Sequence, residues 1–212
     1  MRKVVTARRP PTGGRPGALR LGFHLSPGMR VGLYGGSFNP PHEGHVHVAN
    51  TALRRLGLDK VIWLVSPQNP LKSATGTPRL RRRVKWARRL AHGPVMIVSN
   101  AERRFASRYT IDTVRLFKSR FPAVRFVLIV GADSLAGLDA WRDWQGLLRE
   151  IPLAVVARPG VTIASLESPA ARRFAHARLP GGAGLRLATA RPPAWIYLSA
   201  PWNWASSTAL RK

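Results

Sequence analysis

From residue 29 onward, short runs of β-branched and apolar residues alternate with segments whose apolar residues recur at helical spacing, and this alternation strongly constrains the fold. The runs that we predict to be strands are residues 30–34, 60–66, 95–99, 124–131, 153–157 and 195–198. The stripes that predict helices between them are Ala49, Leu53 and Leu56; Leu80, Val84, Ala87 and Ala91; and Ile111, Val114 and Phe121. We therefore expect an α/β fold, a doubly wound and mostly parallel sheet with helices on both faces. Ligands of such a fold bind beyond the carboxyl ends of the strands.

The composition is that of one domain with a buried core, because 45% of the 212 residues are hydrophobic. Residues 1–28 contain no acid and are rich in Arg, Pro and Gly, so we expect a basic, flexible N-terminal extension before a domain at 29–212. The absence of cysteine excludes disulfides, thiolate metal sites and cysteine nucleophiles. No apolar run approaches the roughly 18 residues that span a bilayer, and no signal peptide is evident, so we expect a soluble, cytoplasmic protein with no membrane partner.

The charge is strongly positive, with 35 Lys and Arg against 9 Asp and Glu, a formal balance of +26. Such a field attracts nucleic acid, an anionic membrane surface or a polyphosphate substrate. A nucleic-acid-binding module is therefore an alternative function, and its strongest support is a run of arginines: Arg79, Arg81, Arg82, Arg83, Arg88 and Arg89. These residues lie largely off the apolar stripe, so a solvated helix face accounts for them, and no nucleic-acid motif accompanies them. Nucleic acid is the disfavoured partner.

A loop suited to phosphate binding follows the first predicted strand. Residues 35–45 read Gly-Gly-Ser-Phe-Asn-Pro-Pro-His-Glu-Gly-His and lead into a predicted helix at 46–56. Glycines let backbone N–H groups approach an anion, and a helix N-terminus adds further donors. Histidines 42 and 45 can face the same side, although such a pair could also serve only as surface or capping residues. The spacing matches neither a P-loop, nor G-x-G-x-x-G, nor the His-Glu-x-x-His motif of zinc proteases.

Two signatures identify a family resemblance. Residues 35–45 resemble the G-x-F-[DN]-P-x-H-x-G-H signature of the nucleotidylyltransferase superfamily, and residues 206–211, Ser-Ser-Thr-Ala-Leu-Arg, resemble its C-terminal [ST]-S-T-x-[IL]-R signature. Three segments between them are similar to those of bacterial nicotinate-nucleotide adenylyltransferases of the NadD type: 109–113 (Tyr-Thr-Ile-Asp-Thr), 131–135 (Gly-Ala-Asp-Ser-Leu) and 157–160 (Ala-Arg-Pro-Gly). The resemblance runs from about residue 30 to residue 211 and implies a Rossmann-like fold.

The reaction that this resemblance implies is transfer of AMP from ATP to nicotinate mononucleotide, which gives deamido-NAD and pyrophosphate. ATP is then a substrate, and Mg²⁺ is expected as a cofactor held mainly by the ATP phosphates, with no metal ligand from the protein. The attacking phosphate is already ionised near neutral pH, so the reaction needs no general base. Catalysis would depend on holding two anions in line and stabilising the charge on the phosphoryl groups.

The resemblance also assigns site residues. The implied catalytic residues are His42, His45 and Arg211. The implied ATP-binding residues are Gly35, Gly36, Ser37, Phe38, Arg158, Ser206, Ser207 and Thr208. Those implied for the nicotinate nucleotide are Thr110 at the carboxylate, Asp133 at the ribose, Trp141 stacked on the pyridine ring and Lys72 at a phosphate. Helix capping is the alternative role of Thr110 and Asp133, a solvated loop position that of Lys72, and a place in the core is expected for Trp144.

Related nucleotidylyltransferases that act on pantetheine phosphate or glycerol phosphate share the first signature. Neither group accounts for residues 109–113 together with Trp141, so the nicotinate nucleotide remains the expected substrate. Because one triphosphate must contact both signatures, we expect the histidine pair and the C-terminal hydroxyl cluster to lie side by side.

Overall fold

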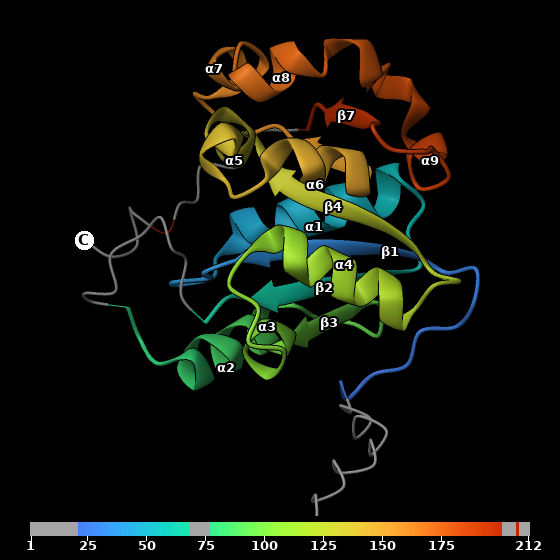
Figure 1. Cartoon of the computed structure of the whole chain (residues 1–212). Helices are drawn as coiled ribbons and strands as arrows, with labels where there is room; N and C mark the ends of the chain where they lie inside the picture. Colours follow the sequence, from blue (N-terminus) through green and yellow to red (C-terminus); the bar gives the residue numbers. More distant parts are fainter. Residues whose placement is uncertain (1–20, 68–76, 201–206, 208–212) are drawn as a thin grey trace, which may run out of the picture.

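The computed structural model describes residues 21–67, 77–200 and 207. Within these ranges seven strands form one sheet in the order β3-β2-β1-β4-β5-β7-β6, and every pairing is parallel (Figure 1). The strands are β1 (Arg30–Gly36), β2 (Lys60–Val65), β3 (Met96–Ser99), β4 (Arg125–Gly131), β5 (Leu153–Val156), β6 (Arg178–Leu179) and β7 (Trp195–Leu198). The predicted fold class and all six predicted strands are confirmed. The two residues of β6 are too few to produce a recognisable apolar run.

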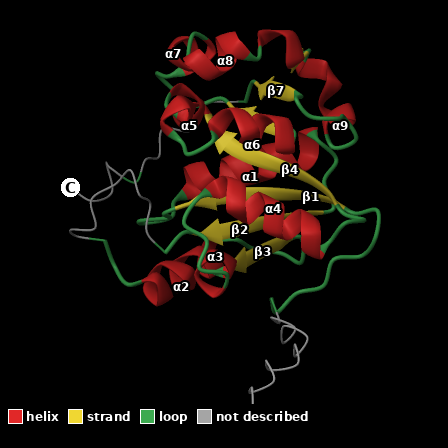
Figure 2. Cartoon of the chain, viewed as in Figure 1, coloured by secondary structure: helices red, strands yellow, loops and turns green. Residues whose placement is uncertain are grey.

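Helices cover both faces of this sheet (Figure 2). The α-helices are α1 (Glu43–Arg55), α2 (Leu80–Leu90), α3 (Ala101–Arg104), α4 (Thr110–Arg120), α5 (Ala132–Ala136), α6 (Trp144–Glu150), α7 (Thr162–Leu166), α8 (Pro169–Arg173) and α9 (Gly184–Leu187). Three 3₁₀ turns join them in the described ranges: η1 (Leu138–Ala140), η2 (Ala175–Ala177) and η3 (Gly181–Ala183). In the described part of the chain, no helix combines the length and the apolar content needed to cross a bilayer.

The core has two halves because successive residues of a strand point to opposite faces of the sheet. In β2, Ile62 and Leu64 lie in the half that is covered by α3, α4, α5, α6 and α8. Their neighbours Val61, Trp63 and Val65 lie in the other half, against α1, α2 and α9. Strands buried on both faces read as continuous apolar runs, which explains why the central strands were recognisable in the sequence.

The direction in which the chain builds the sheet reverses between β1 and β4. From β1 the chain proceeds outward through β2 to β3, and then returns to place β4 on the other side of β1. At such a switch point the loops that follow the two strands leave toward opposite faces and open a crevice beyond the carboxyl ends. The phosphate-type loop after β1 and the segment after β4 therefore flank the position where a ligand is expected.

The N-terminal segment joins the core earlier than the expected boundary at residue 29. Leu25 is 4% exposed and belongs to the same buried cluster as Val31 and Phe117. The Gly28 N–H also donates to the Ala123 carbonyl at 2.7 Å. The expectation of a flexible extension is therefore wrong for residues 21–28, whose apolar residues were too few to show a period, while residues 1–20 lie outside the described ranges.

Candidate active site

The loop after β1 is anchored by an aromatic side chain. Phe38 adopts a left-handed backbone conformation with φ of 46°. Its ring lies in the core, where it is 1% exposed, stacks on Trp63 at 5.1 Å and meets Tyr34 edge-on at 5.5 Å. The Phe38 side chain, implied as an ATP contact, is therefore buried in the core, so its backbone is the part that remains available to a ligand. Gly35, Gly36 and Ser37 lie on either side of the point where β1 ends.

His42 and His45 form a reciprocal cap at the start of α1. His42 Nδ1 accepts the Gly44 N–H at 3.1 Å, and His45 Nδ1 accepts the His42 N–H at 3.2 Å. This cap explains why α1 begins at Glu43, three residues before the predicted start. The two imidazoles lie together, with 3.9 Å between ring centroids. Because each Nδ1 accepts a backbone N–H, each neutral ring carries its proton on Nε2.

The electrostatic surroundings keep His42 neutral. The residue is 5% exposed. Burial lowers the pKa of its imidazole from 6.5 to about 4, with the Arg158 charge adding to the shift and the Asp133 carboxylate opposing it. At neutral pH His42 therefore presents an uncharged Nε2–H donor. The two charges that act on this ring follow β5 and β4, at the same edge of the sheet as the histidine pair.

An ion pair joins the segments that follow β4 and β5. Arg158 Nη1 lies 3.1 Å from Asp133 Oδ2. Glycine at 131 permits this approach, since a Cβ there would collide with Asp133 Oδ1 and lie 2.9 Å from Arg158 Cδ. Asp133 is not the cap of α5, which begins after Gly131 without a side-chain cap. The capping alternative for Asp133 therefore does not apply.

The C-terminal signature is represented among the described residues by Ser207. Its Oγ donates to the Pro40 carbonyl at 2.8 Å, in the loop that leads to His42. This contact joins residues 167 positions apart and brings the two signatures side by side at this point. The other predicted site residues of this region, Ser206, Thr208 and Arg211, lie outside the described ranges, as does Lys72.

The segments implied in pyridine recognition also meet. Thr110 is the first residue of α4, whose cap is Tyr109, so Thr110 itself is not a capping residue. Trp141 follows η1 and is partly buried against the core. The next residue, Arg142, places its guanidinium 4.7 Å from the centre of the Tyr109 ring. The two segments are thus in contact through Arg142 and Tyr109, and Arg142 is a residue that the sequence alone did not single out.

Trp144 has the structural role that was expected. Its ring meets Phe174 edge-on at 6.0 Å and packs against the buried cluster. Trp141 is therefore the tryptophan of this pair that remains a candidate for ring stacking.

Arg83 corrects the expectation that the arginines of α2 form a solvated face. The others in that set are exposed, but Arg83 is 1% exposed. Its guanidinium donates to the carbonyls of both Ser37 and Ser66, each at 2.7 Å. The sequence did carry a signal, because Arg83 lies three residues after Leu80 and four before Ala87, in line with the apolar stripe.

No group of three or more His, Cys, Asp or Glu side chains in the described ranges is arranged to hold a metal ion. The acidic side chain found at the site, Asp133, is engaged by Arg158. In the described part of the chain, the candidate site therefore has no cluster of carboxylates that could by itself hold Mg²⁺.

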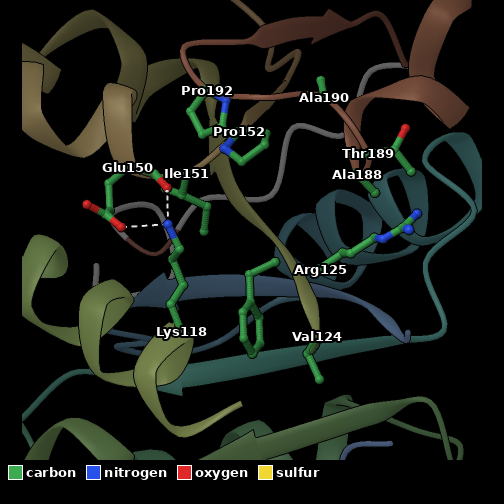
Figure 3. Close-up of a pocket in the computed structure, with 11 residues that line it drawn as sticks. Lys118, Val124, Arg125, Glu150, Ile151, Pro152, Ala188, Thr189, Ala190 and Pro192 are labelled. Atoms are coloured by element: carbon green, nitrogen blue, oxygen red, sulfur yellow. Dashed lines mark hydrogen bonds and ion pairs between the residues drawn. The ribbon is translucent and has the colours of Figure 1, made fainter. Parts of the chain in front are cut away.

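A separate pocket of about 300 Å³ opens at the opposite edge of the sheet (Figure 3). It lies where β4 and β5 begin, beside Val124 and Pro152. Its lysine, Lys118, is already bound to Glu150, at 2.8 Å from the carbonyl and 2.5 Å from the carboxylate. This pocket is not at the switch point and holds none of the predicted site residues.

A parallel doubly wound sheet, a glycine loop at its switch point and a pair of histidines that cap the following helix are together typical of the class of α/β nucleotidyltransferases. A family model described as cytidylyltransferase-like matches residues 33–212. The chain is 61% identical over 183 residues to the probable nicotinate-nucleotide adenylyltransferase of Caulobacter sp. (strain K31), covering 86% of this chain and 97% of that protein. It is 50% identical over 183 residues to the protein of the same name from Methylorubrum extorquens, covering 86% and 99%. The chain belongs to the cytidylyltransferase-like family and, within it, to the nicotinate-nucleotide adenylyltransferases.

The fold is also that of a solved member of this group. The Plasmodium falciparum nicotinic acid mononucleotide adenylyltransferase complexed with NaAD aligns with a TM-score of 0.62 at 15% identity, covering 86% of this chain and 82% of that chain. At this identity the likeness concerns the fold alone.

Proposed function

We propose that this protein transfers the AMP moiety of ATP to nicotinate mononucleotide, giving deamido-NAD and pyrophosphate. The observation that carries the proposal is the capped pair His42 and His45, which lies at the switch point and is preceded by the loop whose Pro40 carbonyl accepts a hydrogen bond from Ser207 of the second signature. The names of the relatives in Caulobacter and Methylorubrum support the same reaction.

The histidine pair would stabilise the phosphoryl groups of ATP. The attacking phosphate of nicotinate mononucleotide is ionised near neutral pH, so no residue needs to remove a proton from it. What the reaction needs is hydrogen-bond donors aimed at oxygens whose charge grows in the transition state. We assign this role to the Nε2–H groups of His42 and His45, which the α1 cap holds in place, with backbone N–H groups of residues 35–38 around the phosphates.

The roles that we propose for the other nucleotide-binding residues follow from their places in the fold and from the family resemblance. Arg158 lies close enough to His42 to influence its titration, so we place it at the phosphates or the adenosine of ATP. Asp133 would accept hydroxyls of a ribose, as acids at the ends of strands do in related folds. Ser206, Ser207, Thr208 and Arg211 retain the pyrophosphate contacts that the family resemblance implies, and Lys72 retains its implied phosphate contact.

The acceptor would bind where α4 begins. The Thr110 hydroxyl and the free N–H groups of the first turn of α4 suit a carboxylate better than a neutral amide. The Trp141 ring offers a face for the electron-poor pyridinium. These two features would select nicotinate over nicotinamide.

Mg²⁺ would enter with the triphosphate. Its ligands would be phosphate oxygens and water, as is usual where Mg²⁺ accompanies a nucleotide. The proposed compartment is the cytoplasm, where ATP is supplied.

The decisive experiment is release of pyrophosphate from ATP, measured with three acceptors in turn: nicotinate mononucleotide, nicotinamide mononucleotide and phosphopantetheine. We expect turnover with nicotinate mononucleotide and much weaker turnover with the amide. Preference for phosphopantetheine would overturn the assignment. Absence of turnover, combined with tight binding to a random oligonucleotide at physiological salt, would favour the nucleic-acid alternative.

A further inference from the structure

A buried arginine ties together two loops at the catalytic edge of the sheet. The Arg83 guanidinium donates from Nη1 to the Ser37 and Ser66 carbonyls, each at 2.7 Å, and from Nη2 to the Pro67 carbonyl at 2.7 Å. Its Nε donates to the Pro78 carbonyl at 3.0 Å. Each of these four hydrogen bonds therefore goes to a main-chain oxygen.

These oxygens come from distant parts of the sequence. Ser37 belongs to the loop after β1 that precedes the histidine pair, whereas Ser66 and Pro67 follow β2. Pro78 precedes α2, the helix that carries Arg83. The planar guanidinium fork can contact all of them at once, which a lysine ammonium with donors on a single atom cannot do.

The arrangement places an uncompensated positive charge beneath the phosphate loop. Within the described ranges no carboxylate forms an ion pair with Arg83. Burial of a charge is costly unless strong hydrogen bonds offset it, and burial lowers the pKa of this guanidinium, although an arginine stays protonated. A hydrophobic residue at this point of α2 would avoid that cost but would leave four carbonyls without their donor.

The hydrogen bond from Arg83 fixes the direction of the Ser37 carbonyl, and this direction matters for nucleotide binding. A carbonyl oxygen that faced the nucleotide would repel the triphosphate, whereas the bond to Arg83 turns this oxygen toward the interior. The N–H groups of the loop are then available for the phosphates, and a fixed positive charge lies behind them.

We propose that Arg83 is a positioning residue for adenylyl transfer: through the Ser37 carbonyl it holds the phosphate loop in its anion-binding conformation, and through Ser66 and Pro67 it couples that loop to the segment after β2. This inference rests on the proposed function, since it concerns the ATP phosphates of that reaction.

The test compares Arg83→Lys and Arg83→Met with wild type in pyrophosphate release, with kcat and both KM values measured. We expect Arg83→Lys to remain folded at the assay temperature, with a lowered melting temperature because buried carbonyls lose their donor, and to lose about tenfold in kcat with the KM for nicotinate mononucleotide unchanged. Arg83→Met should lose up to about 100-fold, the scale expected when reacting groups are misplaced by about 1 Å. A purely structural role would lower the melting temperature without this selective loss of kcat.

The matched control is Arg82→Met on the same helix. Arg82 is exposed, and its guanidinium lies 4.7 Å from the centre of the Trp86 ring, away from the loops. This variant should retain the kcat of wild type. If Arg83→Lys also retains it, the inference is overturned, whether or not Arg83→Met folds. If the wild-type protein itself does not turn over nicotinate mononucleotide, it is the proposed function that fails.

Discussion

At the scale of single residues, each of the two histidines uses one ring nitrogen, Nδ1, in the helix cap, while the proposed function uses the other, Nε2. His42 and His45 each use Nδ1 to accept a backbone N–H of the cap, which fixes both the ring orientation and the tautomer. The tautomer that results carries its proton on Nε2, which is the donor that the proposed function assigns to the phosphates. A substitution can therefore separate the two functions of the ring.

The His42→Asn variant separates the capping function of the ring from its function as a hydrogen-bond donor. Asparagine is a good N-cap and can accept the Gly44 N–H in place of Nδ1, but it has no group at the position of Nε2. We expect kcat for pyrophosphate release to fall by about a hundredfold to a thousandfold, the range for loss of one donor to a developing charge. Melting curves should stay close to those of wild type, and an unchanged kcat would remove His42 from catalysis.

The lowered pKa of His42 predicts a pH dependence of stability. The folded protein holds this ring neutral down to about pH 4, whereas the unfolded chain takes up a proton near pH 6.5. The contribution of His42 to the free energy of unfolding is therefore fully present above pH 6.5 and is lost as the pH falls toward 4. The melting temperature of wild type should fall more steeply than that of His42→Asn over this range. Parallel curves for the two proteins would contradict the assignment.

At the scale of elements, the candidate active site is built from the ends of β1, β4 and β5 rather than from any one of them. Adjacent parallel strands bring their carboxyl ends to one edge, so the loop after β1 lies at the same edge as Asp133 after β4 and Arg158 after β5, which form an ion pair. The close packing of the last two depends on the absence of a side chain at Gly131.

Replacing Gly131 with Ala should disturb the site more than the fold. The added Cβ would meet Asp133 and Arg158, whose flexible side chains can move aside at small cost in stability. We expect kcat/KM to fall by about tenfold because the ion pair is displaced from the nucleotide. The control is Gly137→Ala at the other end of α5, where a Cβ would meet nothing within 4 Å. Equal kcat/KM values for the two variants would show that the close approach of Asp133 and Arg158 to Gly131 is unimportant.

At the scale of the whole molecule, the domain includes residues that precede the first strand. Leu25 lies in the larger buried cluster, and the chain around it is held to the loop before β4 by the Gly28–Ala123 hydrogen bond. The N-terminal segment thus covers part of the core. From the sequence, only the sheet and its helices were expected to form that core.

Removing this cover should lower the free energy of unfolding. Leu25→Ala should cost about 2–5 kcal/mol, the range for a buried leucine, as measured by urea denaturation. A chain that begins at Met29 should likewise be less stable than one that begins at Leu21. Ile163→Ala, at a position that is 73% exposed, provides the control and should change stability by less than about 0.5 kcal/mol. A Leu25 variant as stable as this control would place the domain boundary back at residue 29.

Most of the architecture was predictable because it depends on local patterns. The runs that became β1, β2, β4 and β5 are apolar on both faces, which a parallel sheet requires. The start of α1 was predicted three residues too late, since recognising a histidine cap requires the ring orientations that only coordinates give. The folding of Leu25 onto the core escaped prediction because the alternation of Leu21, Phe23 and Leu25 is too short to stand out in a segment rich in Arg, Pro and Gly.

By itself the sequence determined the fold class, the family and the identity of the histidine pair, because strand runs, helical stripes and signature spacings are properties of neighbouring residues. Only the tertiary structure decided which side of the Phe38 loop faces a nucleotide, that Ser207 meets Pro40, and that Arg83 lies inside the molecule. These features arise between segments far apart in the chain. Whether a guanidinium is solvated or bound to carbonyl oxygens depends on the loops that pack over it, and no local pattern specifies that packing.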